Sequence, residues 1–142
     1  MTLRRRSIIG CALAIIGLGG FSLIFGGRLC ETAAARRAAA EINSGEVFVL
    51  AADQLSLGAG YPGSEAILKR AGLRVRPCHS RGDRFDCFPW AGVEQARTIG
   101  PFQFEVRWGF AAAPLAGYGV RTRYLVILGL VIEIGQTGEW AA

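Results

Sequence analysis

The segment RPCHSRGDRFDCFP, residues 76–89, holds the side chains of this sequence with the most varied chemistry. It contains Cys78 and Cys87, the only histidine of the chain, His79, and an acidic partner for it, Asp86. Four roles fit these residue types: a zinc site, a redox-active dithiol, an acid–base pair, or a structural disulfide. The spacing of the four residues helps to decide between these roles.

Gly82-Asp83 between two short extended runs predicts a two-residue hairpin turn. In that hairpin Cys78 faces Cys87 at a non-hydrogen-bonded position, where Cα atoms lie ~4.5 Å apart. Neighbouring side chains in a strand point to opposite faces, so the cysteines diverge from His79 and Asp86. This argues against a zinc site, which needs four convergent ligands.

A structural disulfide between Cys78 and Cys87 therefore remains, worth ~2–3 kcal/mol for a loop of this length. A redox pair has shorter spacing and lies at a helix start, and no Ser or Cys nucleophile stands beside the His–Asp pair. Pro77 would occupy a hydrogen-bonded position that it cannot serve, so pairing ends at the bridge or the register differs. The Arg-Gly-Asp triplet is explained by the turn, and the outer face of the hairpin is a predicted partner contact: His79, Arg81, Arg84 and Asp86.

The compartment follows from the N-terminus. Residues 7–27, SIIGCALAIIGLGGFSLIFGG, carry no charge and are long enough to cross a ~30 Å hydrocarbon layer as a helix. Arg4, Arg5 and Arg6 precede them and favour a cytoplasmic N-terminus. We expect a single-pass protein of the bacterial inner membrane, with its C-terminal domain in the periplasm, where cysteines oxidise. A cleaved signal peptide and a lipoprotein box ending at Cys11 are the alternatives.

Small residues at four-residue spacing in this segment predict close packing against a partner helix: Gly10, Ala14, Ser22 and Gly26. Residues 28–43 are rich in alanine, so the helix is expected to continue out of the membrane. Cys30 falls near the outer membrane surface, where a free thiol and an intermolecular bridge both remain open.

Charge is concentrated in the N-terminal part. The chain carries 16 Lys+Arg against 11 Asp+Glu, a net charge of +5. Residues 1–43 account for +4 of it and residues 44–142 for +1. A nucleic-acid-binding domain would instead carry a basic face, so nucleic acid is excluded as the expected partner.

Residues 44–142 form the predicted periplasmic domain. Residues 46–51 read as a strand, 64–72 as a helix with Ser64 as N-cap, and 73–76 as the start of a strand. Residues 102–108 alternate apolar and polar, and the apolar run 124–134 reads as one central strand covered on both faces. Residues 109–119 read as an apolar loop, either covered by the domain or exposed, in which case its predicted contacts with lipid or a partner are Phe110, Leu115 and Tyr118.

The expected fold class is α+β: a transmembrane helix over 7–27 after a cytoplasmic segment 1–6, a juxtamembrane helix over 28–43, and a mostly antiparallel domain with one short helix and one hairpin disulfide. This layout resembles type IV pilins and pseudopilins. Their processing signal places Gly before a Phe-led apolar run with a Glu five residues in, and residues 4–9 here have neither feature.

We therefore expect a non-catalytic accessory or assembly subunit of an inner-membrane complex, with other membrane subunits and the lipid bilayer as partners. A pilin-like component of a secretion or pilus apparatus is the first alternative, and a periplasmic hydrolase using His79 and Asp86 is the second. No catalytic, cofactor-binding or metal-binding residues are predicted, and no small-molecule substrate is evident.

Overall fold

The computed structural model describes residues 3–43, 45–50, 61–78 and 87–141. A long helix, α1 (Leu3–Ile42), is followed by β1 (Glu46–Leu50), α2 (Ser64–Arg70) and β2 (Arg74–Cys78). Five further strands complete the chain: β3 (Trp90–Val93), β4 (Arg97–Gly100), β5 (Gln103–Ala113), β6 (Ala116–Ile127) and β7 (Leu130–Ala141). The α+β class is confirmed.

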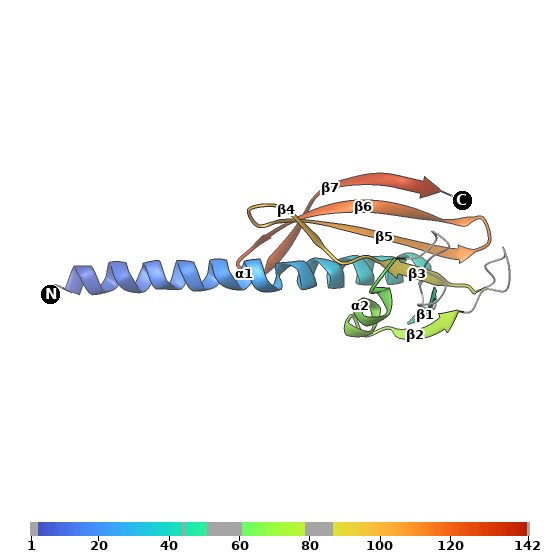
Figure 1. Ribbon diagram of the computed structural model, residues 1–142, viewed down its shortest axis with the longest axis horizontal. Coiled ribbons are helices and arrows are strands. Elements are labelled where there is room, and N and C mark those ends of the chain that lie inside the picture. Colours follow the sequence, from blue (N-terminus) through green and yellow to red (C-terminus); the bar gives the residue numbers. More distant parts are fainter. Residues whose placement is uncertain (1–2, 44, 51–60, 79–86, 142) are drawn as a thin grey trace.

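Helix α1 has 40 residues and is therefore about 60 Å long at 1.5 Å per residue. Its N-terminal half extends beyond the sheet, and its C-terminal half lies along the sheet (Figure 1). Within the described part of the chain, no single helix passes the length and hydropathy test for a membrane span. Segments Ser7–Phe21 and Leu23–Ile42, inclined by 44° to each other, pass that test together.

The C-terminal half of α1 packs through small side chains. Cys30, Ala34, Ala35 and Ala38 recur at helical spacing and are all fully buried. Gly26 continues this stripe, and a Cβ there would lie 2.6 Å from the ring of Phe104 on β5. Small residues let the helix axis approach the sheet closely, so the predicted helix over 28–43 is confirmed and serves as one wall of the core.

A buried carboxylate fixes α1 to the rest of the domain. Glu31 is 7% exposed and accepts hydrogen bonds from Arg70 on α2 at 2.5 Å and from the backbone N–H of Ala96 at 2.9 Å. A second link joins Arg37 to Glu133 on β7 at 2.6 Å.

The sheet is mixed, with strand order β2-β1-β3-β5-β6-β7 and with β4 paired to β5. Four strand pairs are antiparallel, as expected for most of the domain: β3–β5, β4–β5, β5–β6 and β6–β7. β1 pairs parallel with both β2 and β3, and α2 supplies the crossover between β1 and β2. The parallel pairs were not predicted, because β1 and β2 are too short for their pairing to be read from sequence.

Helix α2 begins differently from the prediction. Ser64 is its first helical residue, the N-cap position is Gly63, and no side chain caps the helix. The Ser64 hydroxyl instead bonds backbone groups of Tyr61 and Val93, tying α2 to β3. The predicted end of this helix is confirmed, because Gly72 has a φ of +87° immediately after the C-cap residue Ala71.

The core lies between α1, α2 and one face of β5 and β6. Alternate residues of these strands point inward: Phe104, Val106 and Trp108 face Tyr124, Thr122 and Val120 across the β5–β6 pair. Two polar groups among them pair with each other, since the indole N–H of Trp108 donates to the Thr122 hydroxyl at 2.9 Å. This alternation confirms the strand expected over 102–108, except that Phe102 itself lies in the turn before β5.

Two predictions about the C-terminal third are wrong. Residues 109–119 form the β5–β6 hairpin rather than a loop, with its turn at Pro114–Leu115. Residues 124–134 are two strands, because β6 ends at Ile127 and β7 starts at Leu130 after a turn containing Gly129, whose φ is +79°. Pro114 and Gly129 are turn-forming residues, but their neighbours are apolar and neither turn contains Asn, Asp or Ser, so the sequence signal for each turn is weak.

Candidate functional site

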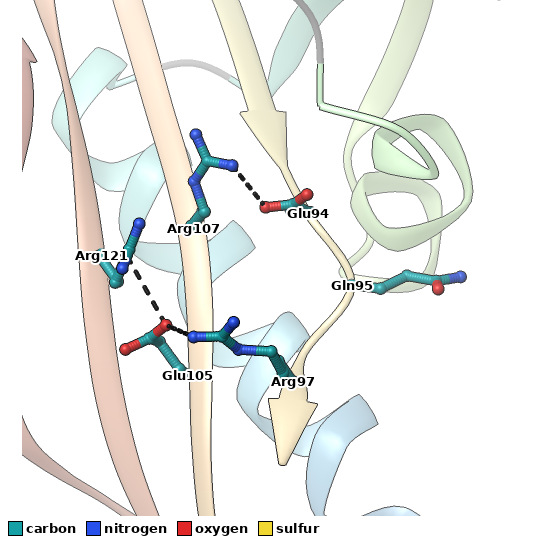
Figure 2. A pocket seen from close by; sticks show the side chains of 6 residues that line it. All are labelled: Glu94, Gln95, Arg97, Glu105, Arg107 and Arg121. Carbon is teal, nitrogen blue, oxygen red and sulfur yellow. Dashed lines mark hydrogen bonds and ion pairs between the residues drawn. The ribbon is translucent and has the colours of Figure 1, made fainter. Parts of the chain in front are cut away.

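A polar cavity of about 200 Å³ lies on the sheet face opposite α1. Its wall comes from β4, β5, β6 and the segment between β3 and β4, and its lining residues are Glu94, Gln95, Arg97, Glu105, Arg107 and Arg121. Figure 2 shows five of these side chains gathered around two ion-pair groups, while Gln95 points away from the others. Glu105 and Arg107 project here because they alternate with the core residues of β5.

Glu105 is the centre of the first group. Its side chain is 5% exposed, although its position in the alternating pattern predicts a solvated residue. Arg97 on β4 donates to it at 2.8 Å, Arg123 on β6 lies at 3.2 Å, and Arg121 at 3.6 Å. Burial alone would raise the pKa of Glu105, but the hydrogen bonds and charges of these three arginines together lower it.

Glu139 on β7 is the centre of the second group. It accepts from Arg107 at 3.0 Å and from Arg121 at 2.8 Å, and Arg107 also lies 3.3 Å from Glu94. The hydrogen bond from Arg107 to Glu139, opposed by burial, is the main reason that the pKa of Arg107 is raised. Arg121 approaches both carboxylates, so the two groups form one ion-pair network across β4, β5, β6 and β7.

An aromatic cluster borders this network. Tyr61, Trp90 and Trp140 lie with neighbouring ring centroids 5.8 and 6.2 Å apart, and the Trp140 indole N–H donates to the Tyr61 hydroxyl at 3.1 Å. The guanidinium of Arg107 lies 5.9 Å from the Tyr61 ring centroid, which joins the cluster to the network. Burial is the first cause of the raised pKa of Tyr61, so its hydroxyl stays neutral and acts as a hydrogen-bond acceptor here.

The charged groups that line the cavity are paired with one another. Each of the three arginines makes an ion pair with a carboxylate, and the lowered pKa keeps Glu105 ionised, which removes it as a general acid near neutral pH. Outside the gaps in the described chain, no three His, Cys, Asp or Glu side chains are grouped as metal ligands would be. The arrangement can hold four strands in register and present a charged surface bordered by aromatic rings.

The sequence did not reveal this network. Its ion-pair partners are 8 to 32 residues apart in the sequence, so no local spacing indicates them. One sequence signal points to the aromatic cluster: Gly109 and Gly119 interrupt β5 and β6 opposite each other. A Cβ on Gly119 would collide with the Trp140 indole, so these glycines make room for the aromatic rings.

The predicted disulfide is present. Cys78 and Cys87 are bonded, with Cα atoms 6.0 Å apart, wider than the predicted hairpin pair requires. Cys78 ends β2, where the preceding Pro77 lies opposite Val49 of the parallel neighbour β1. β2 is an edge of the sheet, which is where a strand tolerates proline. The hairpin contacts His79, Arg81, Arg84 and Asp86 lie outside the described residues.

The other predicted contact residues differ in their exposure. Phe110 is buried at 8% exposure against Tyr118, with ring centroids 4.6 Å apart, so the expectation of an exposed Phe110 is wrong. Tyr118 is half-buried, and Leu115 at the hairpin turn is 87% exposed. Burial raises the pKa of the Cys30 thiol to about 12, and this cysteine points into the core rather than toward a neighbouring molecule.

The four small residues predicted to contact a partner helix also differ in their surroundings. Gly10 has open space where a Cβ would be, and Ala14 is exposed, so both are available to a neighbouring helix. Gly26 is occupied by Phe104 of its own domain, which corrects its assignment to a partner helix. The side chain of Ser22 lies outside the described part.

Comparisons of the chain with protein-family models, with curated proteins and with solved structures found no match. The functional argument therefore rests on the geometry of the chain itself.

Proposed function

We propose that this chain is a non-catalytic subunit of a bacterial inner-membrane protein complex, anchored by the N-terminal half of α1, with its sheet domain in the periplasm. The observation that carries the proposal is the exposure of that half-helix. Its large apolar side chains between Ile8 and Phe25 are 41–72% exposed, and the N-terminal part of the helix extends beyond the sheet (Figure 1). Apolar surface of this extent requires a lipid or protein cover.

Three features support the assignment to a membrane. The half-helix contains no charge between Ser7 and Gly27, three arginines precede it, and a disulfide is formed in the domain that follows it. These are the expected properties of an anchor with a cytoplasmic N-terminus and a domain on the oxidising side. The self-neutralising network of the outer sheet face supports a binding role rather than a catalytic one.

The test is extraction of the full chain from native membranes in a mild detergent, followed by size-exclusion chromatography. The proposal predicts that the chain elutes with at least one other membrane protein in fixed stoichiometry, and that it pellets with membranes after washing at alkaline pH. Elution only as a free monomer contradicts the subunit role. Release by the alkaline wash contradicts the anchor.

A pilin-like component is the second candidate, favoured by one observation. The C-terminal half of α1 lies on a largely antiparallel sheet while the apolar half stays free, so copies can associate through that free half. Arg36 and Ala40 are exposed on α1 and suit crosslinking through introduced cysteines in a Cys11→Ser background. Homo-oligomer ladders at both positions would favour this candidate, and their absence would count against it.

A further inference from the structure

Two turns at one end of the sheet lie against α1. They are the turn before β5, which contains Phe102, and the β6–β7 turn, which contains Leu128. With Ile15, Leu18 and Gly19 of α1, and with Ile127, these residues line an apolar cavity of about 240 Å³. We use the term apolar tips for Phe102, Ile127, Leu128 and Leu130.

The apolar tips face outward. Their side chains are 36%, 45%, 64% and 67% exposed, respectively. Phe102 and Leu128 also have positive φ values, 58° and 52°, in a conformation that favours Gly, Asn or Asp in a turn. Large apolar residues at such positions carry a conformational cost, which suggests that the side chains themselves are used.

The tips lie at the level of the middle of the apolar half-helix, since Ile15 and Gly19 straddle the centre of residues 7–27. Whatever surrounds α1 at Ile15 therefore also surrounds the tips. We infer that the apolar tips insert into the periplasmic leaflet of the bilayer beside α1, so that the sheet domain is held against the lipid. This inference rests on the proposed membrane anchor.

Arginines lie further along α1 and the sheet than the apolar tips, at positions that suit lipid headgroups. Arg28 is exposed on α1, and Arg97 and Arg123 are 70% and 58% exposed on the sheet. Arg28 lies about 15 Å behind Leu18 along the helix, and Arg123 about 13 Å behind Ile127 along β6, from the rise per residue. Arginines at this distance can reach headgroup phosphates while the tips contact acyl chains.

The depths agree with the thickness of a membrane. From Arg6 to Arg28, α1 advances by 22 residues, or ~33 Å at 1.5 Å per residue. This is close to the ~30 Å of a hydrocarbon core. Arg28, Arg97 and Arg123 then lie at one interface and Arg4–Arg6 are placed near the other.

The sheet limits how far it can enter. In the described chain no strand pairs with the outer edge of β7, and unpaired backbone groups are costly in hydrocarbon. Glu133, paired with Arg37, follows the apolar tips by three residues on β7. Insertion therefore reaches no further than about Glu133, which lies ~10 Å behind Leu130 along β7 and close to the level of Arg123.

The test uses the full chain in a Cys11→Ser background, with a fluorescent label on one introduced cysteine: Ile15→Cys, Leu128→Cys or Leu115→Cys. The protein is reconstituted into phosphatidylcholine–phosphatidylglycerol vesicles that contain a nitroxide-labelled lipid as quencher. Leu115 is the matched control, because it is also an exposed leucine with positive φ in a turn, at the other end of β6. The inference predicts strong quenching at Ile15 and Leu128 and none at Leu115.

Quenching at Ile15 without quenching at Leu128 overturns the inference and leaves the anchor standing. Absence of quenching at both positions overturns the anchor as well. Equal quenching at Leu115 and Leu128 also overturns it, because contact would not be specific to the tips. As a second measurement, a label at Ile132→Cys is expected to lose quenching in the Phe102→Asn/Leu128→Asn variant, whose asparagines tolerate positive φ; retained quenching contradicts a role for the tip side chains.

Discussion

The two halves of α1 differ in what covers them. From Ile8 to Phe25 the helix displays large apolar side chains on its surface. From Gly26 to Ala38 the covered positions are small (Gly, Cys and Ala), apart from the buried carboxylate Glu31. Large side chains suit a fluid apolar surrounding, and small ones suit a rigid sheet that must come close. Under the proposed function, one continuous helix serves both as anchor and as core element, with the change near Gly26.

Two phenylalanines test the difference between the halves: Phe104 of β5, which packs on the C-terminal half of α1, and Phe21, which lies on the N-terminal half. Phe104 is 3% exposed against Gly26, and Phe21 is 49% exposed. Phe104→Ala is expected to lower the free energy of unfolding by about 3–5 kcal/mol through cavity formation. Phe21→Ala, the control, should leave it unchanged in denaturant titrations of the detergent-solubilised chain followed by tryptophan fluorescence. Equal losses in the two variants would contradict the division.

The disulfide belongs to the domain alone. Replacing Cys78 and Cys87 together by Ser should lower the free energy of unfolding by about 2–3 kcal/mol, because the reduced chain gains freedom when unfolded. Retention in the membrane pellet should not change, since the anchor half of α1 makes no contact with the bridge. A double variant that leaves the membrane fraction would show that the two halves depend on each other.

Two glycines of the same helix test the boundary. Gly26→Leu places a side chain into the Phe104 ring and is expected to cost about 1–3 kcal/mol of unfolding free energy. Gly10→Leu meets no atom within 4 Å and should be neutral in the same titration. A neutral Gly26→Leu would mean that α1 does not rest on β5 as described.

The outer network predicts a smaller, pH-dependent effect. Because the pKa of Glu105 is lowered on folding, its ion pairs stabilise the fold fully above the unfolded pKa of about 4.3. That stability is lost as the pH falls through the lower folded pKa. Glu105→Gln should cost about 1–3 kcal/mol at neutral pH and flatten this acid dependence.

Glu65→Gln is the matched control for Glu105. Its partner Lys69 and Glu65 itself are each more than half exposed, so the variant should change stability by less than about 0.5 kcal/mol. A loss at Glu105 no larger than the loss at Glu65 would mean that the outer network contributes no more than a surface ion pair.

Local sequence patterns predicted the features of the fold that depend on neighbouring residues. The uncharged and Ala-rich stretches predicted the helix α1. The alternation of apolar and polar residues predicted β5, and two cysteines on either side of an expected turn predicted the disulfide. The predictions for 109–119 and 124–134 failed because Leu115 and Leu128 make their turns largely apolar. The first segment was therefore predicted as a loop and the second as a single strand. The burial of Glu105 was missed because its arginines come from β4 and β6, and sequence spacing does not show which strands become neighbours.

The most direct test of the central claim uses Cys11. It is exposed on the anchor half of α1, whereas Cys30 is buried and Cys78 and Cys87 are bonded to each other, so it is the one accessible free thiol of the chain. The full chain in sonicated membrane vesicles is treated with a membrane-impermeant maleimide before and after denaturation in detergent. The account predicts labelling of Cys11 only after denaturation, and rapid labelling in intact vesicles would contradict an anchor embedded in lipid.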